Sequence, residues 1–195
     1  QAECVTGQSF VRYWLHNNMV TVNGQKMSKS LGNFITLKDA FAGNEPLERP
    51  VRPMVVRYFI LTSHYRSPLD FSVSALDAAQ KGLERIEGTV GRVRRAVGSA
   101  PEGELSEAIK NLTDQARSDF EAEMNNDFNT AGAIGMLSQF TREVNRVLDE
   151  SDLTIGDLQA IHGLYECLGG DVLGIITAGT GGKSEAGIEA DLIET

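Results

Sequence analysis

One short segment concentrates the side chains that best bind and stabilise phosphate charge. The segment is Lys26-Met27-Ser28-Lys29-Ser30, and a glycine follows at position 32. Each lysine ammonium group is a compact charge with three hydrogen-bond donors, the serines add hydroxyl donors, and glycine permits backbone turns that other residues resist. When a carboxylate attacks the α-phosphate of a nucleoside triphosphate, negative charge grows on that phosphate and on the departing pyrophosphate. A mobile loop with these groups can close over the charge and stabilise it.

The residues alone leave two interpretations of this loop open. In the first, Lys26, Ser28, Lys29 and Ser30 contact the phosphates of ATP, and Met27 is an apolar anchor that seats the loop. In the second, the segment is the exposed, lysine-rich end of a hairpin without a ligand. An isolated match to so short a pattern favours the second interpretation, so the flanking sequence has to decide.

The surrounding pattern predicts the elements that position the loop. Residues 7–15 have an apolar face at helical spacing, and residues 19–22 read as a strand. Asn23-Gly24 indicates a hairpin turn, after which residues 25–27 begin the returning strand. Thr36 and Asp39 form a capping box that starts a helix ending near residues 42–43. Pro53 suits the first turn of a further helix that extends to about residue 63.

From residue 74 onward, apolar side chains recur at three- or four-residue steps, which is typical of amphipathic helices. Four helices are predicted. The first begins at a capping box of Ser74 and Asp77 and ends at residues 98–99, and the second spans about residues 105–125. The third begins after the N-cap Asn129 and ends near residue 148, and the fourth begins at a capping box of Thr154 and Asp157 and ends at residues 169–170. Four such helices joined by short loops form an up-and-down bundle. We therefore expect a mainly α fold, in which a small α/β region carries the loop and a four-helix bundle follows.

Charge is unevenly distributed along the 195 residues, whose net charge is −9. Residues 1–70 hold eight Lys or Arg and five Asp or Glu, which gives a net charge of +3. Residues 71–195 hold ten Lys or Arg and 22 Asp or Glu, which gives a net charge of −12. The whole-chain charge argues against a general nucleic-acid binder. The N-terminal third has the sign needed to meet phosphates locally.

Other features bound the location and the metal content. No apolar run approaches the roughly 18 residues of a membrane span, and there is no basic, apolar leader. Cys4 and Cys167 are far apart in the sequence and fit free thiols in a reducing cytosol. The three histidines, His16, His64 and His162, lack the spacing of a metal site. We expect a cytoplasmic protein without a membrane contact and without metal ligands in this chain.

The flanks of the loop resemble cysteinyl-tRNA synthetase, a class I aminoacyl-tRNA synthetase family whose signature loop has the same five residues as 26–30. The similar stretches are Phe10 to Asn17, Val20 to Phe34, Arg57 to Leu69 and Met124 to Thr130. The resemblance is strong over residues 1 to about 70, clear around 124–130 and weak after about 170. It favours the interpretation of the loop as an ATP-phosphate site.

The resemblance implies the activity and the site residues. The family makes cysteinyl adenylate from cysteine and ATP and then transfers cysteine to tRNA(Cys). Lys26 and Lys29 match the signature lysines and are the catalytic candidates, with Lys29 the better candidate for ATP contact. Met27, Ser28 and Ser30 complete the expected site for the ATP phosphates.

The resemblance also implies a zinc ion that selects the substrate thiol through Cys, His and Glu ligands. These ligands are expected outside this chain, because Gln1-Ala2-Glu3 resembles the stretch just past the last two of them. Glu3 and Cys4 are therefore not expected to bind zinc.

Three regions follow from the resemblance. Residues 1–70 correspond to the end of the catalytic domain and the signature-loop (stem-contact) region, residues 71–172 to a helical bundle domain, and residues 173–195 to a flexible linker toward a C-terminal domain. The N-terminal nucleotide-binding core and the C-terminal anticodon-reading domain of the family are not in the sequence. We therefore expect a fragment of a monomeric enzyme that is inactive by itself.

Two other functions stay open. One is a ligase that activates cysteine for a small amine acceptor, since such relatives share the signature loop. The other is a non-catalytic helical module that binds RNA or a protein, against which the net charge of −12 over residues 71–195 counts. His64, beside Tyr65 and Arg66, is expected either at the junction between domains or in contact with tRNA, and His162 is expected to be structural.

Overall fold

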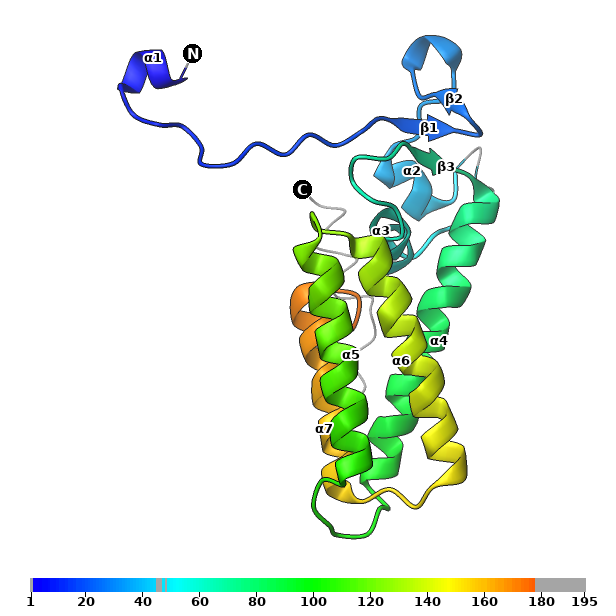
Figure 1. The fold of residues 1–195 in the computed structure, drawn as a ribbon. Helices are drawn as coiled ribbons and strands as arrows, with labels where there is room; N and C mark the ends of the chain where they lie inside the picture. The colour runs from blue at the N-terminus through cyan, green and yellow to red at the C-terminus, as the bar shows by residue number, and fades with distance from the viewer. Residues whose placement is uncertain (1, 45–46, 48, 178–195) are drawn as a thin grey trace.

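The computed structural model describes residues 2–44, 47 and 49–177. A short helix α1 (Ala2–Thr6) and an extended segment lead into a small sheet, which lies at one end of four long helices (Figure 1). The prediction of a mainly α fold, with a small α/β region before a four-helix bundle, is confirmed.

The described residues form one sheet of three strands in the order β2-β1-β3. Strands β1 (Val20–Val22) and β2 (Gln25–Lys26) pair antiparallel, and the turn between them has Asn23 at φ 49° and Gly24 at φ 75°. Two positive φ angles define the hairpin turn that an Asn-Gly pair favours, so the predicted hairpin is confirmed. Strand β3 (Leu69–Phe71) pairs parallel with β1 on its other edge.

Parallel strands need a crossover, and here helices α2 and α3 supply it. Helix α2 (Leu37–Ala42) begins with the predicted capping box of Thr36 and Asp39 and ends at Gly43. Helix α3 (Pro53–Leu61) has Pro53 in its first turn, as predicted. The ring of Phe59 on α3 meets that of Phe71 on β3 edge to face, with centroids 5.6 Å apart, so α3 is packed against the sheet.

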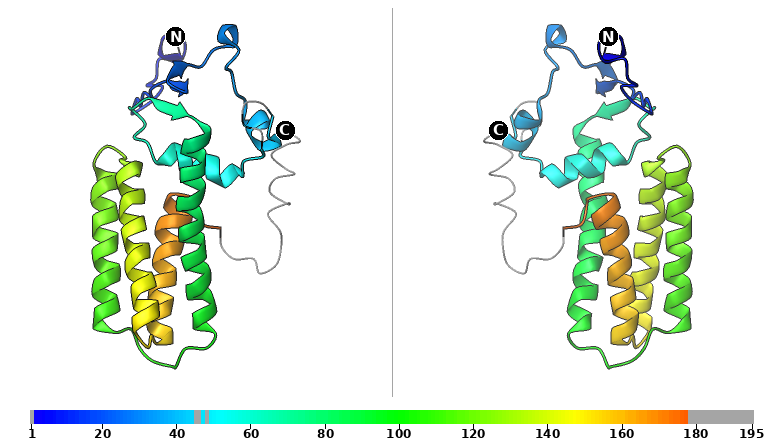
Figure 2. Two further views of the ribbon diagram at one scale, coloured as in Figure 1. Left: turned by 90° about the vertical axis from the view of Figure 1, so that its right-hand side faces the viewer. Right: turned by 90° about the vertical axis from the view of Figure 1, so that its left-hand side faces the viewer.

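The bundle consists of α4 (Val73–Val97), α5 (Glu107–Asn125), α6 (Thr130–Glu150) and α7 (Ile155–Tyr165). Figure 2 shows these four helices side by side, with neighbours in the chain running in opposite directions. Leu83, Val93, Leu137, Val144 and Ile161 are almost fully buried between them. No helix of the described residues combines the length and hydropathy that crossing a membrane requires.

The predicted helix over residues 7–15 is wrong. The only helix near it is α1, which ends at Thr6, and residues 7–19 form no regular helix or strand (Figure 1). Phe10 and Trp14 of the predicted apolar face are 62% and 70% exposed, so this face has no surface to pack on among the described residues. A helix of this length is marginal without such packing, which explains why periodicity alone was misleading.

Two helix limits in the bundle also differ from the sequence prediction. Ser72, rather than Ser74, caps α4, because its hydroxyl accepts a hydrogen bond from the N–H of Ala75. The fourth helix does not end at residues 169–170 but continues as a π-helical turn over Glu166–Val172. The carbonyl of Gly169 then accepts the N–H groups of Ile175 and Ile176 at 2.8 and 3.1 Å, which folds the chain back onto the bundle.

The predicted division into regions at residues 70 and 172 stays a prediction. Of the predicted linker, Leu173, Ile175 and Ile176 are buried, and residues 178–195 lie outside the described residues. The Nε of Arg57 on α3 donates to the carbonyl of Leu173 at 2.9 Å. The end of the bundle is therefore tied to the helix that packs on the sheet.

Candidate functional site

The predicted loop leaves the sheet at the end of β2. Lys26 is the last residue of the strand, and the N–H of Met27 still reaches the carbonyl of Val20 on β1 at 3.5 Å. Met27 is half-buried and packs against the hydrophobic core. The residue predicted as the anchor of the loop is thus in contact with the core, while Lys26 beside it is exposed.

The loop is itself a tight, capped turn. Ser28 caps a single turn of 3-10 helix, Lys29–Leu31, by accepting the N–H of Leu31 on its hydroxyl. The hydroxyls of Ser28 and Ser30 lie 3.2 Å apart. Gly32 ends the turn at φ 67°, a backbone conformation that glycine adopts at no steric cost. The spacing of serine and glycine in the sequence therefore has a local structural reason.

Asn33 braces the loop across its base, a role that the sequence reasoning missed. Its Oδ1 accepts the N–H of Ser28 at 2.9 Å, and its Nδ2 donates to the carbonyl of Lys26 at 3.1 Å. One side chain thereby satisfies backbone groups on both sides of Met27. Asparagine often bonds nearby backbone groups in turns, and its place directly after Gly32 was the available signal.

Both lysine side chains of the loop are exposed and make no ion pair with a described carboxylate. The Nζ of Lys29 lies 5.5 Å from the centroid of the Phe34 ring. Such an exposed cation–π contact contributes only about 0.5–1 kcal/mol. An incoming phosphate can therefore draw the ammonium group away at little cost.

Asp70 on β3 fixes the hairpin that carries the loop. Its Oδ1 accepts the N–H of Gly24 and the hydroxyl of Thr21, each at 2.7 Å. The hydrogen bonds from Gly24 and Thr21 lower the pKa of the Asp70 carboxyl below its ordinary value. No local pattern marks Asp70 as a functional residue, since its partners lie 46 and 49 residues earlier in the chain.

The three histidines lie apart from the loop lysines. The ring of His16 is stacked with Trp14, and His64 meets the connection between α5 and α6. His162 is partly buried on α7, where its Nε2 accepts the Nε–H of Arg94 at 2.8 Å. Its contacts to the bundle agree with the structural role expected for it. Among residues 2–44, 47 and 49–177, no three or more His, Cys, Asp or Glu side chains are grouped so that they could hold a metal ion.

Two family models match the chain. The model of tRNA synthetases class I (C) catalytic domain matches residues 1–81, and that of the DALR domain matches residues 119–177. The first match contains the whole loop and the sheet. The second covers the end of α5 and all of α6 and α7.

Several cysteine–tRNA ligases align with most of this chain. A cysteine–tRNA ligase of Chlorobaculum tepidum is 41% identical over 176 residues, which are 90% of this chain and 33% of that protein. One of Thioalkalivibrio sulfidiphilus is 43% identical over 195 residues, 97% of this chain and 38% of that protein. The chain thus spans roughly a third of the length of the curated relatives it matches.

A solved structure has a similar fold. The LeuRS in a ternary complex with tRNA and LeuAMS from Agrobacterium radiobacter superposes with a TM-score of 0.60 at 20% identity. The superposition covers 82% of this chain and 23% of that one. At this identity the likeness concerns the fold alone.

Proposed function

The chain belongs to the cysteinyl-tRNA synthetase family, and on that premise we propose that the protein carrying it activates cysteine with ATP and transfers it to tRNA(Cys). The observation that carries the proposal is the loop of residues 26–33. It is capped and braced by its own side chains, yet both of its ammonium groups are exposed. This arrangement suits transient contact with a polyphosphate.

The proposed chemistry of the loop is electrostatic. A carboxylate oxygen of cysteine forms a bond to the α-phosphorus of ATP as the bond to the β-phosphate oxygen breaks and pyrophosphate leaves. Lys29 and Lys26 stabilise the charge that grows on the α-phosphate and the pyrophosphate, and the hydroxyl groups of Ser28 and Ser30 donate hydrogen bonds to the phosphate oxygens. In the second step, a hydroxyl of the terminal adenosine of tRNA attacks the cysteinyl carbonyl, and AMP leaves.

The zinc ion implied by the family is proposed to bind outside this chain. The described residues offer no group of three potential metal ligands, and Cys4 and Cys167 lie at opposite ends of the sequence. When bound, the ion would select the thiol of cysteine. None of the steps assigned to the loop depends on it.

Replacing Lys29 by alanine in the full-length protein tests the role of the loop. We expect the kcat of cysteine-dependent ATP–pyrophosphate exchange to fall by roughly 100-fold, with little change in the KM for cysteine, because the ammonium group stabilises the negative charge that grows on the phosphates in the transition state. Lys38→Ala is the matched control, since Lys38 is an exposed lysine in the first turn of α2. Equal rates for the Lys29 variant and the control would remove Lys29 from the mechanism.

A charging assay tests the acceptor. The full-length protein is expected to attach cysteine to tRNA(Cys) and to leave small amines unmodified. Attachment to a small amine, but not to tRNA, would instead establish the alternative cysteine-activating ligase. The names of the relatives support the tRNA acceptor. We also propose that the enzyme is a cytoplasmic monomer, which light scattering of the purified protein checks for the oligomeric state.

A further inference from the structure

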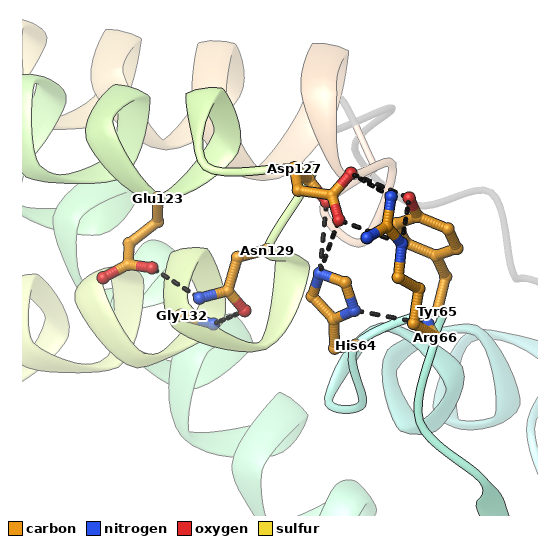
Figure 3. Close-up of polar contacts among 7 residues, drawn as sticks. All are labelled: His64, Tyr65, Arg66, Glu123, Asp127, Asn129 and Gly132. Atoms are coloured by element: carbon orange, nitrogen blue, oxygen red, sulfur yellow. Dashed lines mark hydrogen bonds and ion pairs between the residues drawn. The ribbon is translucent and has the colours of Figure 1, made fainter. Parts of the chain in front are cut away.

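The connection between α5 and α6 contacts the connection between α3 and β3 through one carboxylate (Figure 3). Oδ1 of Asp127 accepts the hydroxyl of Tyr65 at 2.8 Å, and its Oδ2 lies 3.1 Å from the Nε of Arg66. The Nε2 of His64 faces the carbonyl of Asp127 at 3.2 Å, while its Nδ1 accepts the N–H of Arg66. Three consecutive residues therefore meet the same residue of the bundle.

The bundle holds Asp127 in a backbone conformation that residues other than glycine rarely adopt. Asp127 and Phe128 have φ angles of 55° and 52°, in the left-handed region. Directly after them, Asn129 caps α6 by accepting the N–H of Gly132 at 3.1 Å, and its Nδ2 donates to Glu123 on α5 at 2.6 Å. Such a backbone persists only where its surroundings enforce it, so the turn that presents Asp127 is firmly built.

From Tyr65 and Arg66 the contacts continue to the loop-bearing hairpin. The N–H of Asn18 donates to the carbonyl of Tyr65 at 2.9 Å, and its Nδ2 donates to that of Arg66 at 2.8 Å. One residue later, the carbonyl of Met19 accepts the N–H of Leu69 at 3.1 Å. The parallel pairing of β1 with β3 begins at this point, and β1 in turn pairs with β2.

We propose that Asp127 is a positioning residue for adenylation, because it fixes the base of the hairpin whose far end is the loop of residues 26–33. The proposal rests on the function assigned to that loop above. Asp127 holds Tyr65 and Arg66, these hold the residues that enter β1, and β1 sets the direction in which β2 delivers Lys26 and Lys29. The helical bundle thereby takes part in aligning charged groups that it does not touch.

The decisive variant is Asp127→Gly in the full-length protein. Glycine removes the carboxylate and accepts the left-handed backbone without strain. We expect the kcat of pyrophosphate exchange to fall roughly 10-fold with the KM for cysteine unchanged, since a small misplacement of a catalytic group is costly even when its origin is remote. Tyr65→Phe, which deletes the hydroxyl from the other side of the contact, should lower kcat in the same direction, and serves if Asp127→Gly folds poorly.

Phe128→Gly is the matched control. It makes the same replacement at the next left-handed residue, whose side chain is 56% exposed, and is expected to keep kcat within about twofold. Asp127→Asn should restore most of the rate, because asparagine tolerates this backbone and offers Tyr65 an oxygen acceptor. A full rate in Asp127→Gly, or equal losses in Asp127→Gly and Phe128→Gly, overturns the proposal.

Two measurements separate positioning from a general loss of stability and from failure of the proposed function. In a Lys29→Ala background, Asp127→Gly should lower kcat by much less than 10-fold. If the double variant instead loses the product of the two single-variant factors, Asp127 does not act through the loop.

Hydrogen exchange gives a readout that does not depend on activity: the amides of Met27 and Leu69 should lose protection in Asp127→Gly but not in Phe128→Gly. Unchanged protection overturns the positioning role even if Lys29→Ala confirms the chemistry. If protection is lost in Asp127→Gly but Lys29→Ala keeps the full exchange rate, Asp127 positions the hairpin and the chemistry assigned to the loop is rejected.

Discussion

The brace formed by Asn33 gives a quantitative test of how the loop is kept ready. Asn33→Ala removes the hydrogen bonds to Ser28 and to Lys26, of 2.9 and 3.1 Å. A net contribution of about 1 kcal/mol per bond gives about 2 kcal/mol for the pair. Because the bond to Lys26 is exposed, water replaces part of it, and we expect the ordered loop to lose about 1–2 kcal/mol.

This loss of loop stability should lower the rate of pyrophosphate exchange. A loop held by so few bonds has little stability in reserve, so destabilising it lowers the population of the ordered form. A change of 1–2 kcal/mol lowers the ratio of ordered to disordered loop about 5- to 30-fold, so the kcat of pyrophosphate exchange should fall by up to about that factor. The unfolding temperature of the whole protein should hardly change, because the loop contributes little to the core.

The assay is cysteine-dependent ATP–pyrophosphate exchange with the full-length protein, at saturating cysteine and varied ATP. Asn44→Ala is the control, because Asn44 lies just after the end of α2 and its Nδ2 donates a hydrogen bond of similar length, 3.1 Å, to Oδ1 of Asp39 in the first turn of that helix. We expect the control to keep its rate. If Asn33→Ala exchanges pyrophosphate as fast as Asn44→Ala, the order of the loop does not depend on the brace, and the reasoning fails.

Two further predictions concern the stability of the bundle. Burial by itself would raise the pKa of the Asp157 carboxyl, but hydrogen bonds from Ser106 and Thr154 outweigh burial and hold the pKa below its ordinary value. Because the native pKa is lowered, the stabilisation by the Asp157 carboxylate is fully present above about pH 4 and declines as the pH falls toward the native pKa. Asp157→Asn should therefore cost about 2 kcal/mol of unfolding free energy at pH 7 and less at pH 3 in urea titrations. Equal losses at both pH values would contradict it. Leu83→Ala, at a fully buried position of α4, should lower the unfolding free energy by about 3 kcal/mol, and a cost no larger than that of Leu105→Ala, at a position 41% exposed, would show that the core is not packed as described.

The helices of the bundle could be predicted because their signals are local. Apolar residues at helical spacing, Asn129 as an N-cap and the box of Thr154 and Asp157 all act within a few residues of one another, and the structure has each of them. The errors arose where the tertiary surroundings of a segment, or their absence, decided against its local preference. The face of residues 7–15 has nothing to cover it among the described residues, and Ser72 rather than Ser74 caps α4, because β3 ends at Phe71 immediately before it.

The sequence by itself determined the chemistry of the loop, since two lysines, two serines and a glycine act through their types and close spacing. It also determined the hairpin turn, whose positive φ angles an Asn-Gly pair favours. Only the tertiary structure decided what orients the hairpin that carries the loop. Asp70 and Asp127 reach partners 46 to 62 residues away in the chain, and contacts over such separations leave no periodic or local pattern to read. Their selection depends on how the crossover and the bundle bring distant segments together, which the packing of the whole chain sets.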